Sequence, residues 1–146
     1  RNSKIKGFEL AKKSIEILNK KINLKLFLLD GNIHPSKIPL LINASDCLLV
    51  TSLYEGSPNI IKEALACNLP IVSVDVGDVK DQLYGVKYSS IVTRDPEIIA
   101  NKLFEILLLG EQSNGRKILL NNQQDLNSVS NQVSEIYKRI VGTCAK

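Results

Sequence analysis

The sequence has no tryptophan, few aromatic residues and a single histidine among its 146 residues. Because single-stranded nucleic acids are bound largely by stacking on aromatic side chains, an aromatic share of 5% argues against a nucleic-acid partner. Apolar runs are also short, and none approaches the roughly 18–20 residues that cross a bilayer. A Gly-x-x-x-x-Gly-Lys phosphate loop is missing, so ATP hydrolysis has no sequence support.

Cysteine is scarce as well: the three are Cys47, Cys67 and Cys144. An odd number without C-x-x-C spacing argues against a disulfide framework and against a zinc site. A reducing compartment and the lack of a secretory signal at the start predict a cytoplasmic protein, with the inner face of the membrane as a further location.

Positive charge is concentrated at the start of the chain. Residues 1–25 hold eight basic and two acidic side chains, a net charge of +6, whereas the remaining residues sum to −2. One interpretation is a solvated, lysine-rich helix face. The other is an anion site near the start of the chain, with an acidic membrane surface as a peripheral partner. Charge alone does not choose between them.

Strand and helix patterns alternate along the chain, whose length and 44% hydrophobic content suit one domain over residues 1–146. Continuous apolar runs predict strands over 24–29, 47–51, 71–75 and 90–92. Helical spacing predicts helices over 7–20, 36–44, 58–67, 78–84, 95–110, 113–124 and 127–141, with Ser36 and Asp95 as N-caps and a stop at Gly110. The alternation predicts an α/β, Rossmann-like parallel sheet with helices on both faces and ligands at the carboxyl ends of the strands. Since no strand precedes the first helix, we expect a first strand and a partner domain upstream.

Residues 51–78 carry the main functional signal. A predicted strand ends at the start of this segment, and Glu55 and Gly56 form the turn that follows it. Glycine at this position lets the backbone approach a ligand closely. Ser57 is the predicted N-cap of the next helix, and Pro58 is its predicted first residue. A strand, a turn and a helix start at the carboxyl edge of a sheet together predict a ligand site.

The amides of Asn59 and Ile60 are predicted to point out of the helix start, where an anion such as phosphate is favoured. Glu63 lies five residues after Pro58, roughly 7–8 Å along the helix axis. That separation suits a distal phosphate and a ribose, whose diol can donate two hydrogen bonds to a carboxylate. Glu55 then faces the group attached to the distal phosphate. A sugar nucleotide fits all three positions.

These features resemble the E-x7-E region of retaining glycosyltransferases with two Rossmann-like domains, the GT-B fold, and in particular family 4 (group 1). The resemblance rests on Glu55-Gly56-Ser57-Pro58, Glu63-Ala64, Ala66-Cys67, Pro70-Ile71-Val72 and Asp75-Val76-Gly77. Two upstream elements are also similar, namely Ala44-Ser45-Asp46 and Arg1 with Lys6-Gly7. The matching part of the family is its C-terminal, donor-binding domain, which implies an N-terminal acceptor domain of the same protein as partner.

The resemblance implies a role for each matched residue. Arg1 and Lys6 would hold the donor diphosphate and stabilise its growing charge, and Glu55 would contact the transferred sugar. The implied substrate-binding residues are Gly56, Ser57, Asn59, Ile60 and Glu63, with Ile33 near the base. Many family members carry Phe where this chain has Ser57, so a more polar sugar pocket is expected. No metal or other cofactor is required, because basic groups and a helix start can balance the phosphate charge.

The implied activity is transfer of a sugar, of the hexosyltransferase type, from a nucleoside-diphosphate sugar to a saccharide or lipid-linked acceptor, as in polysaccharide biosynthesis. The isolated chain is expected to be inactive. One alternative is a non-catalytic α/β nucleotide-binding or interaction module. Another is a sugar-nucleotide epimerase of the same fold.

Overall fold

Three short parallel strands form the sheet of the computed structural model, which describes residues 4–29 and 31–144. The strands are β1 (Leu48–Val50), β2 (Ile71–Val74) and β3 (Ser90–Val92), in the spatial order β1-β2-β3. In the register, Leu49 is opposite Val72 and Ser73 is opposite Ile91. All four residues of β2 are buried, because this strand has a neighbour on each edge and helices on both faces.

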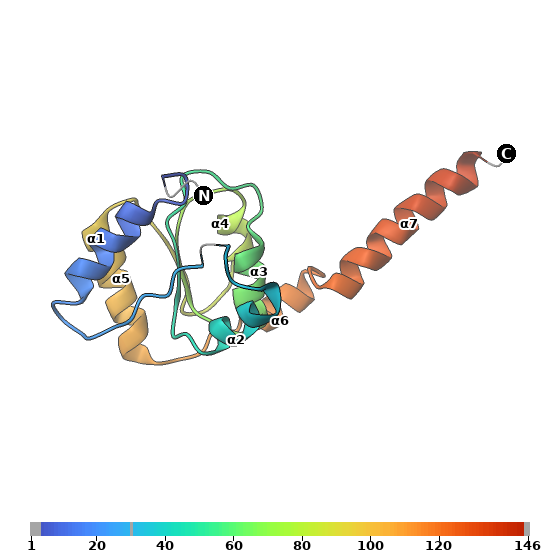
Figure 1. Ribbon diagram of the computed structural model, residues 1–146. Helices are drawn as coiled ribbons and strands as arrows, with labels where there is room; N and C mark the ends of the chain where they lie inside the picture. The colour runs from blue at the N-terminus through green and yellow to red at the C-terminus, as the bar shows by residue number, and fades with distance from the viewer. Residues whose placement is uncertain (1–3, 30, 145–146) are drawn as a thin grey trace.

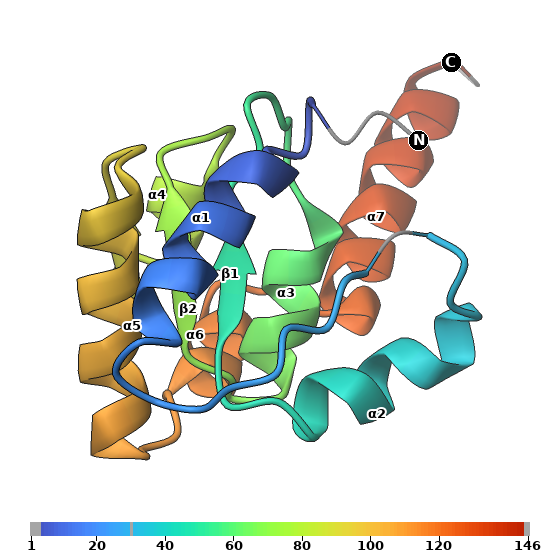
Figure 2. The same ribbon diagram turned by 60° about the vertical axis from the view of Figure 1, so that its left-hand side comes forward.

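Helices cover both faces of the sheet. They are α1 (Phe8–Leu18), the 3₁₀ helix η1 (Pro35–Lys37), α2 (Ile38–Asn43), α3 (Asn59–Ala66), α4 (Val79–Gln82), α5 (Pro96–Leu109), α6 (Gly115–Asn121) and α7 (Leu126–Cys144). Figures 1 and 2 show α1 and α5 on one side of the sheet and α3 on the other. In Figure 1, α7 extends away from the rest of the fold. The prediction of a Rossmann-like α/β fold with a parallel sheet between helices is confirmed.

Helix α5 begins and ends at the residues that its sequence predicts. Asp95 is the N-cap, and its side chain accepts hydrogen bonds from the amides of Glu97 and Ile98. Gly110 ends the helix in the left-handed conformation at φ 63°, as predicted. The cap predicted at Ser36 is wrong: the turn of η1 begins at His34, whose ring nitrogen accepts a hydrogen bond from the Ser36 amide.

The strand predicted over residues 24–29 is not formed. No part of this segment has strand structure, and its apolar side chains are half-exposed, with Phe27 at 57% and Leu28 at 53%. Only the start of the run, at Leu24, packs against the core. A continuous apolar run is a sign of burial, whereas a strand also needs a neighbour to complete its hydrogen bonds. Within the described ranges, the sheet ends at β1, and no strand forms a ladder of hydrogen bonds with this segment.

The core lies between the sheet and the helices of both faces. Its fully buried side chains include Ile61 and Leu65 of α3, Ile71 and Val72 of β2, and Ile99 of α5. Each such side chain stabilises the fold by about 1.5–3 kcal/mol. Leu18 of α1 is also buried, at 1% exposed. Because α1, α3 and α5 are anchored in this way, the loops at the carboxyl ends of β1 and β2 are held between rigid elements.

Candidate functional site

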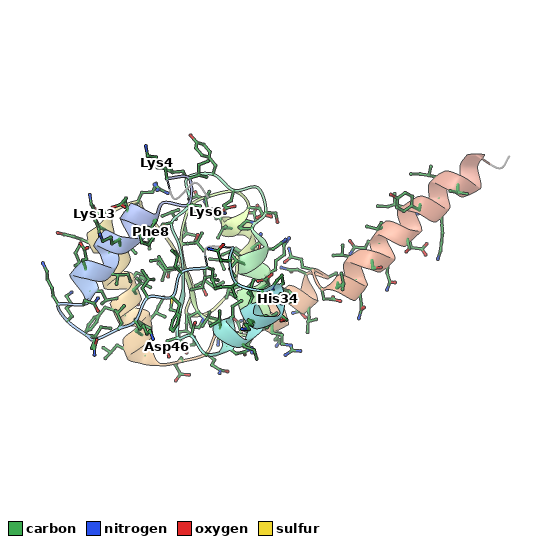
Figure 3. All side chains as sticks on the ribbon, in the orientation of Figure 1. Lys4, Lys6, Phe8, Lys13, His34 and Asp46 are labelled. Atoms are coloured by element: carbon green, nitrogen blue, oxygen red, sulfur yellow. The ribbon has the colours of Figure 1, made fainter. Side chains whose placement is uncertain are left out.

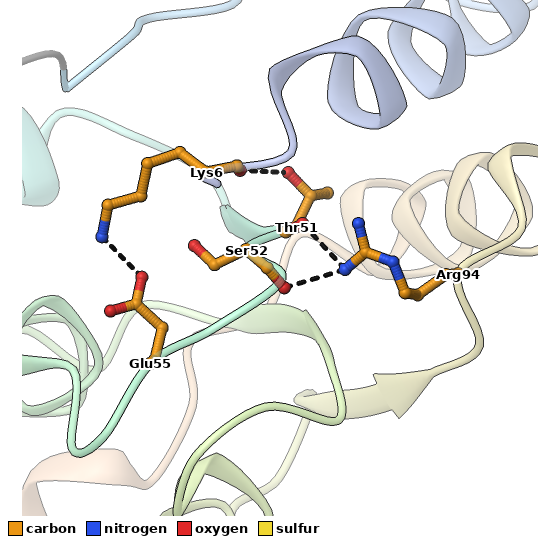
Figure 4. Close-up of polar contacts among 5 residues, drawn as sticks. All are labelled: Lys6, Thr51, Ser52, Glu55 and Arg94. Carbon is orange, nitrogen blue, oxygen red and sulfur yellow. Dashed lines mark hydrogen bonds and ion pairs between the residues drawn. The ribbon is translucent and has the colours of Figure 1, made fainter. Parts of the chain in front are cut away.

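The segment before α1 is fastened to the segment after β1. The Thr51 hydroxyl contacts the carbonyl oxygens of Lys6 at 3.2 Å and Gly7 at 3.0 Å. The amide of Leu53 donates to the carbonyl of Ile5 at 2.7 Å. Figure 4 shows the Thr51 side chain reaching the Lys6 backbone. These contacts bring the start of α1 to the carboxyl edge of the sheet.

Two glycines permit close packing of backbone at this edge. Gly7 has φ 68°, and a Cβ atom built on it would lie 1.9 Å from the carbonyl oxygen of Thr51. Gly77 has φ 56°, and its Cβ would lie 2.2 Å from the carbonyl oxygen of Gly56. That same Gly56 carbonyl accepts a hydrogen bond from the amide of Asp78 at 3.0 Å. The loop that contains Gly56 is therefore held against the loop that follows β2.

An ion pair occupies the centre of the site. Lys6 Nζ lies 2.6 Å from Glu55 Oε1, with 65% of the lysine side chain and 16% of the glutamate side chain exposed. Burial raises the pKa of Glu55, but hydrogen bonds from Lys6 and Ser52 and the lysine charge outweigh it and leave this pKa below its ordinary value. Glu55 is thus ionised at neutral pH, and the structure brings together these two predicted catalytic residues.

Arg94 is a member of this group that the sequence patterns did not indicate. Its Nη1 atom donates to the carbonyl oxygens of Thr51 at 3.0 Å and Ser52 at 2.8 Å. Figure 4 shows the guanidinium reaching these carbonyls from the end of β3. The one available signal was its position two residues after a strand of a parallel sheet, since all carboxyl ends meet at the same edge.

Ser57 does not have the predicted capping role. The N-cap of α3 is Pro58, and no side chain caps this helix. The Ser57 hydroxyl instead accepts hydrogen bonds from Lys62 Nζ at 2.9 Å and Gln82 Nε2 at 3.3 Å. Gln82 is 2% exposed, and its Oε1 atom has no hydrogen-bond partner within the part of the chain that the structure describes. Ser57 therefore connects α3 to α4.

The start of α3 presents backbone donors. The first helical amide with a backbone partner is that of Ile61, which donates to the carbonyl of Pro58 at 3.1 Å. The amides of Asn59 and Ile60 have no acceptor among residues 4–29 and 31–144. Glu63 is exposed and lies four residues after Asn59, which is also exposed, so both are on the solvent face of the helix.

The other predicted positions are less informative. Arg1 lies outside the described residues. Ile33 is half-buried and directly precedes His34, which Figure 3 shows beside α2 and away from Lys6. In the same view, Asp46 lies at the end of the fold opposite to Lys4 and Lys6.

Two hollows of about 420 and 410 Å³ lie elsewhere, along residues 19–24 and between α6 and Asn68. The residues of the Lys6–Glu55 group do not line them, and Lys6 and Gly56 are exposed at the surface. Across the described ranges, no three His, Cys, Asp or Glu side chains gather in a way that could hold a metal ion. Nor does any helix described here have the length and apolar character to span a membrane.

Comparison with known proteins identifies the family. The sequence pattern of the glycosyl transferases group 1 matches residues 5–108, which include Lys6, Glu55, Glu63 and Arg94. A stretch of 69 residues is 41% identical to the uncharacterized glycosyltransferase MJ1059 of Methanocaldococcus jannaschii. It covers 46% of this chain and 16% of that protein, so the chain spans a small part of its relative's length. Since the family pattern matches well over half of the sequence, the chain belongs to the glycosyl transferases group 1.

Proposed function

We propose that this chain is the donor-binding domain of a retaining glycosyltransferase with the GT-B fold, of family 4. It would bind a nucleoside-diphosphate sugar and present the sugar to a saccharide or lipid-linked acceptor held by an N-terminal domain of the same protein. Membership of the glycosyl transferases group 1 supports glycosyl transfer. The observation that carries the donor-binding role is the exposed Lys6 ammonium at 2.6 Å from Glu55 at the carboxyl edge of the sheet.

The diphosphate would lie between Lys6 and the start of α3. Lys6 offers an exposed ammonium group, and the amides of Asn59 and Ile60 offer donors at the positive end of the helix. Fixed charges of this kind stabilise a phosphate without a metal ion. Arg1 would contribute a second cation. Since Glu55 already holds Lys6, an incoming phosphate has to compete with that carboxylate for the lysine.

Glu63 would hold the ribose. Its carboxylate is exposed and lies four residues beyond Asn59, about 6 Å along the axis at 1.5 Å per residue. A carboxylate at this distance from the phosphate can accept hydrogen bonds from both hydroxyls of the pentose. Ile33 would lie beside the base.

Glu55 and Gly56 would face the transferred sugar. A Cβ atom on Gly56 would meet nothing within 4 Å, so this side of the loop is open to a ligand. Because the Ser57 hydroxyl already accepts two hydrogen bonds, from Lys62 and Gln82, it would contact the sugar only by giving up one of them or by donating its own proton. The sugar would therefore be oriented mainly by Glu55 and by backbone groups.

In the proposed reaction, the bond between the anomeric carbon and the diphosphate oxygen breaks as the acceptor oxygen bonds to the same face of the sugar. The acceptor proton moves to an oxygen of the leaving diphosphate. Lys6 would stabilise the charge that develops on that diphosphate, which is the kind of preorganised electrostatic contribution that dominates many enzymes.

The test is calorimetric titration of the 146-residue chain with UDP-, GDP- and ADP-sugars. We expect saturable binding of at least one of them, and about 10–100-fold weaker binding by Lys6→Met, because a charge-assisted hydrogen bond contributes about 1.5–3 kcal/mol. Lys12→Met is the matched control, since it removes the same charge from an exposed position on α1. Absence of binding by every nucleotide sugar would overturn the proposal.

A further inference from the structure

We infer that Arg94 is a positioning residue of this site, which acts through the carboxyl end of β1 on both members of the Lys6–Glu55 pair. The inference extends the proposed function, because the pair is the proposed contact for the donor. Arg94 itself is placed in contact with backbone and not with substrate.

The contact of Arg94 with two consecutive carbonyls fixes a bend in the chain. Consecutive carbonyl groups of an extended strand point in opposite directions. The carbonyls of Thr51 and Ser52 nevertheless both reach the Nη1 atom of Arg94, at 3.0 and 2.8 Å. The backbone must therefore turn away from strand geometry directly after β1. This turn directs the chain toward Glu55.

Each of the two residues held by Arg94 is linked to one member of the ion pair. The Thr51 hydroxyl hydrogen-bonds to the backbone carbonyl of Lys6 at 3.2 Å. Ser52 lies three residues before Glu55, and its side chain contributes to the lowered pKa of that carboxyl group. One guanidinium nitrogen thus holds both the residue whose hydroxyl contacts the Lys6 backbone and the residue from which the chain turns toward Glu55 (Figure 4).

The burial of Thr51 and Ser52 limits the groups that could replace Arg94 as a donor. Thr51 is 5% exposed and Ser52 is 4% exposed, whereas Arg94 is exposed and reaches both of their carbonyls from the surface. A side chain without donors at position 94 removes both hydrogen bonds, and we expect residues 51 and 52 to move as the bend relaxes. Because Gly7 packs directly against the Thr51 carbonyl, such a movement also shifts the start of α1.

The experiment measures the titration of the Glu55 carboxyl group by carbon-detected NMR in the 146-residue chain. Arg94→Met has no donors at the end of its side chain, Arg94→Lys retains a charge and one donor group, and Arg116→Met is the matched control on α6. We expect Arg94→Met to raise the pKa of Glu55 toward its ordinary value, Arg94→Lys to raise it by less, and Arg116→Met to leave it unchanged. Nucleotide-sugar affinity is expected to fall about 3–10-fold in Arg94→Met, as for the loss of roughly one hydrogen bond.

A Lys6→Met background separates positioning from the direct effect of the arginine charge. If Arg94 acts through the pair, Arg94→Met changes the pKa of Glu55 less when Lys6 is already absent, because only the route through Ser52 remains. An unchanged pKa of Glu55 in Arg94→Met would overturn the inference, as would an equal change with and without Lys6. If Arg94→Met does not fold, Arg94→Lys decides in the same way. If the parent chain binds no nucleotide sugar, the proposed function fails, and the Glu55 titration still decides the role of Arg94.

Discussion

The carbonyl oxygen of Thr51 lies 1.9 Å from the point that a Cβ atom on Gly7 would occupy. No L side chain fits at that distance, and the φ of 68° at Gly7 is itself unfavourable for residues with a Cβ. The contact allows the segment that carries Lys6 to lie directly on the end of β1. Glycine at position 7 is thus a requirement of the site as well as of the helix start.

Gly7→Ala is expected to destabilise the protein by roughly 2–4 kcal/mol. The estimate combines the cost of a left-handed conformation with that of a backbone overlap in a packed region. The measurement is urea unfolding followed by circular dichroism. Gly142→Ala is the matched control, because a Cβ atom at that position in α7 meets nothing within 4 Å and alanine is favoured in a helix. A loss of less than about 0.5 kcal/mol in Gly7→Ala would contradict the described contact with Thr51.

Stability is expected to depend on pH through Glu55. Its pKa in the folded chain is lower than its ordinary value of 4.5, so the ionised carboxylate stabilises the fold at pH values above that value. This stabilisation is lost as the pH falls through the folded pKa. Because Lys6 is largely exposed, the contribution is expected to be less than about 1 kcal/mol.

Glu55→Gln provides the check on that pH dependence. The difference in unfolding free energy between the parent chain and this variant should be largest at neutral pH and should shrink in acid. Glu111→Gln, an exposed carboxylate variant, is the control. A difference that grows as the pH is lowered would mean that Glu55 is not stabilised in its ionised form.

The thiol of Cys47 is expected to be unreactive in the folded protein. Burial, with a smaller contribution from the charge of Asp46, raises its pKa to about 12, and a backbone hydrogen bond with Val72 only partly opposes this. The thiolate required for alkylation is therefore almost absent at about pH 8. Peptide-resolved mass spectrometry after brief iodoacetamide treatment should find Cys47 unmodified in native protein and modified in urea. Rapid alkylation of the native chain would contradict this environment.

Much of the fold follows from local sequence signals. The apolar run of β2 is typical of a strand buried on both faces, and the structure buries all its residues. Asp95 and Gly110 mark the limits of α5 because an N-cap side chain and a left-handed glycine act on the backbone directly beside them. The sequence from Glu55 to Glu63 likewise indicated the loop and the helix start that follow β1, since a turn followed by a helix start is a local feature.

Contacts between distant residues could not be predicted in the same way. Arg94 contacts carbonyl groups 42 and 43 residues earlier in the chain, and no spacing in the sequence indicates such a contact. The predicted cap at Ser57 failed for a related reason, because its hydroxyl is engaged by Gln82 from another helix. The run at residues 24–29 has the composition of a strand, but a strand also depends on a neighbour.

Glu63→Ala is expected to distinguish the ribose from the phosphate. If Glu63 accepts hydrogen bonds from the diol, as proposed, its loss should weaken binding of UDP, GDP or ADP by about 10–100-fold. Binding of inorganic pyrophosphate, which has no ribose, should not weaken. Glu97→Ala is the matched control on α5. Equal losses for the nucleotide and pyrophosphate would mean that Glu63 acts on the phosphates or on the fold.

The most direct test of the proposed donor site is amide chemical-shift mapping of the ¹⁵N-labelled chain during titration with a nucleoside diphosphate. We expect the largest changes, at saturation, at Gly7 and Gly56, which adjoin Lys6 and Glu55 in the sequence, and at Asn59 and Ile60 at the start of α3. Changes centred on the hollow beside α6 would contradict the proposed donor site. So would the absence of any saturable change up to about 10 mM ligand, which corresponds to a binding free energy weaker than roughly 3 kcal/mol.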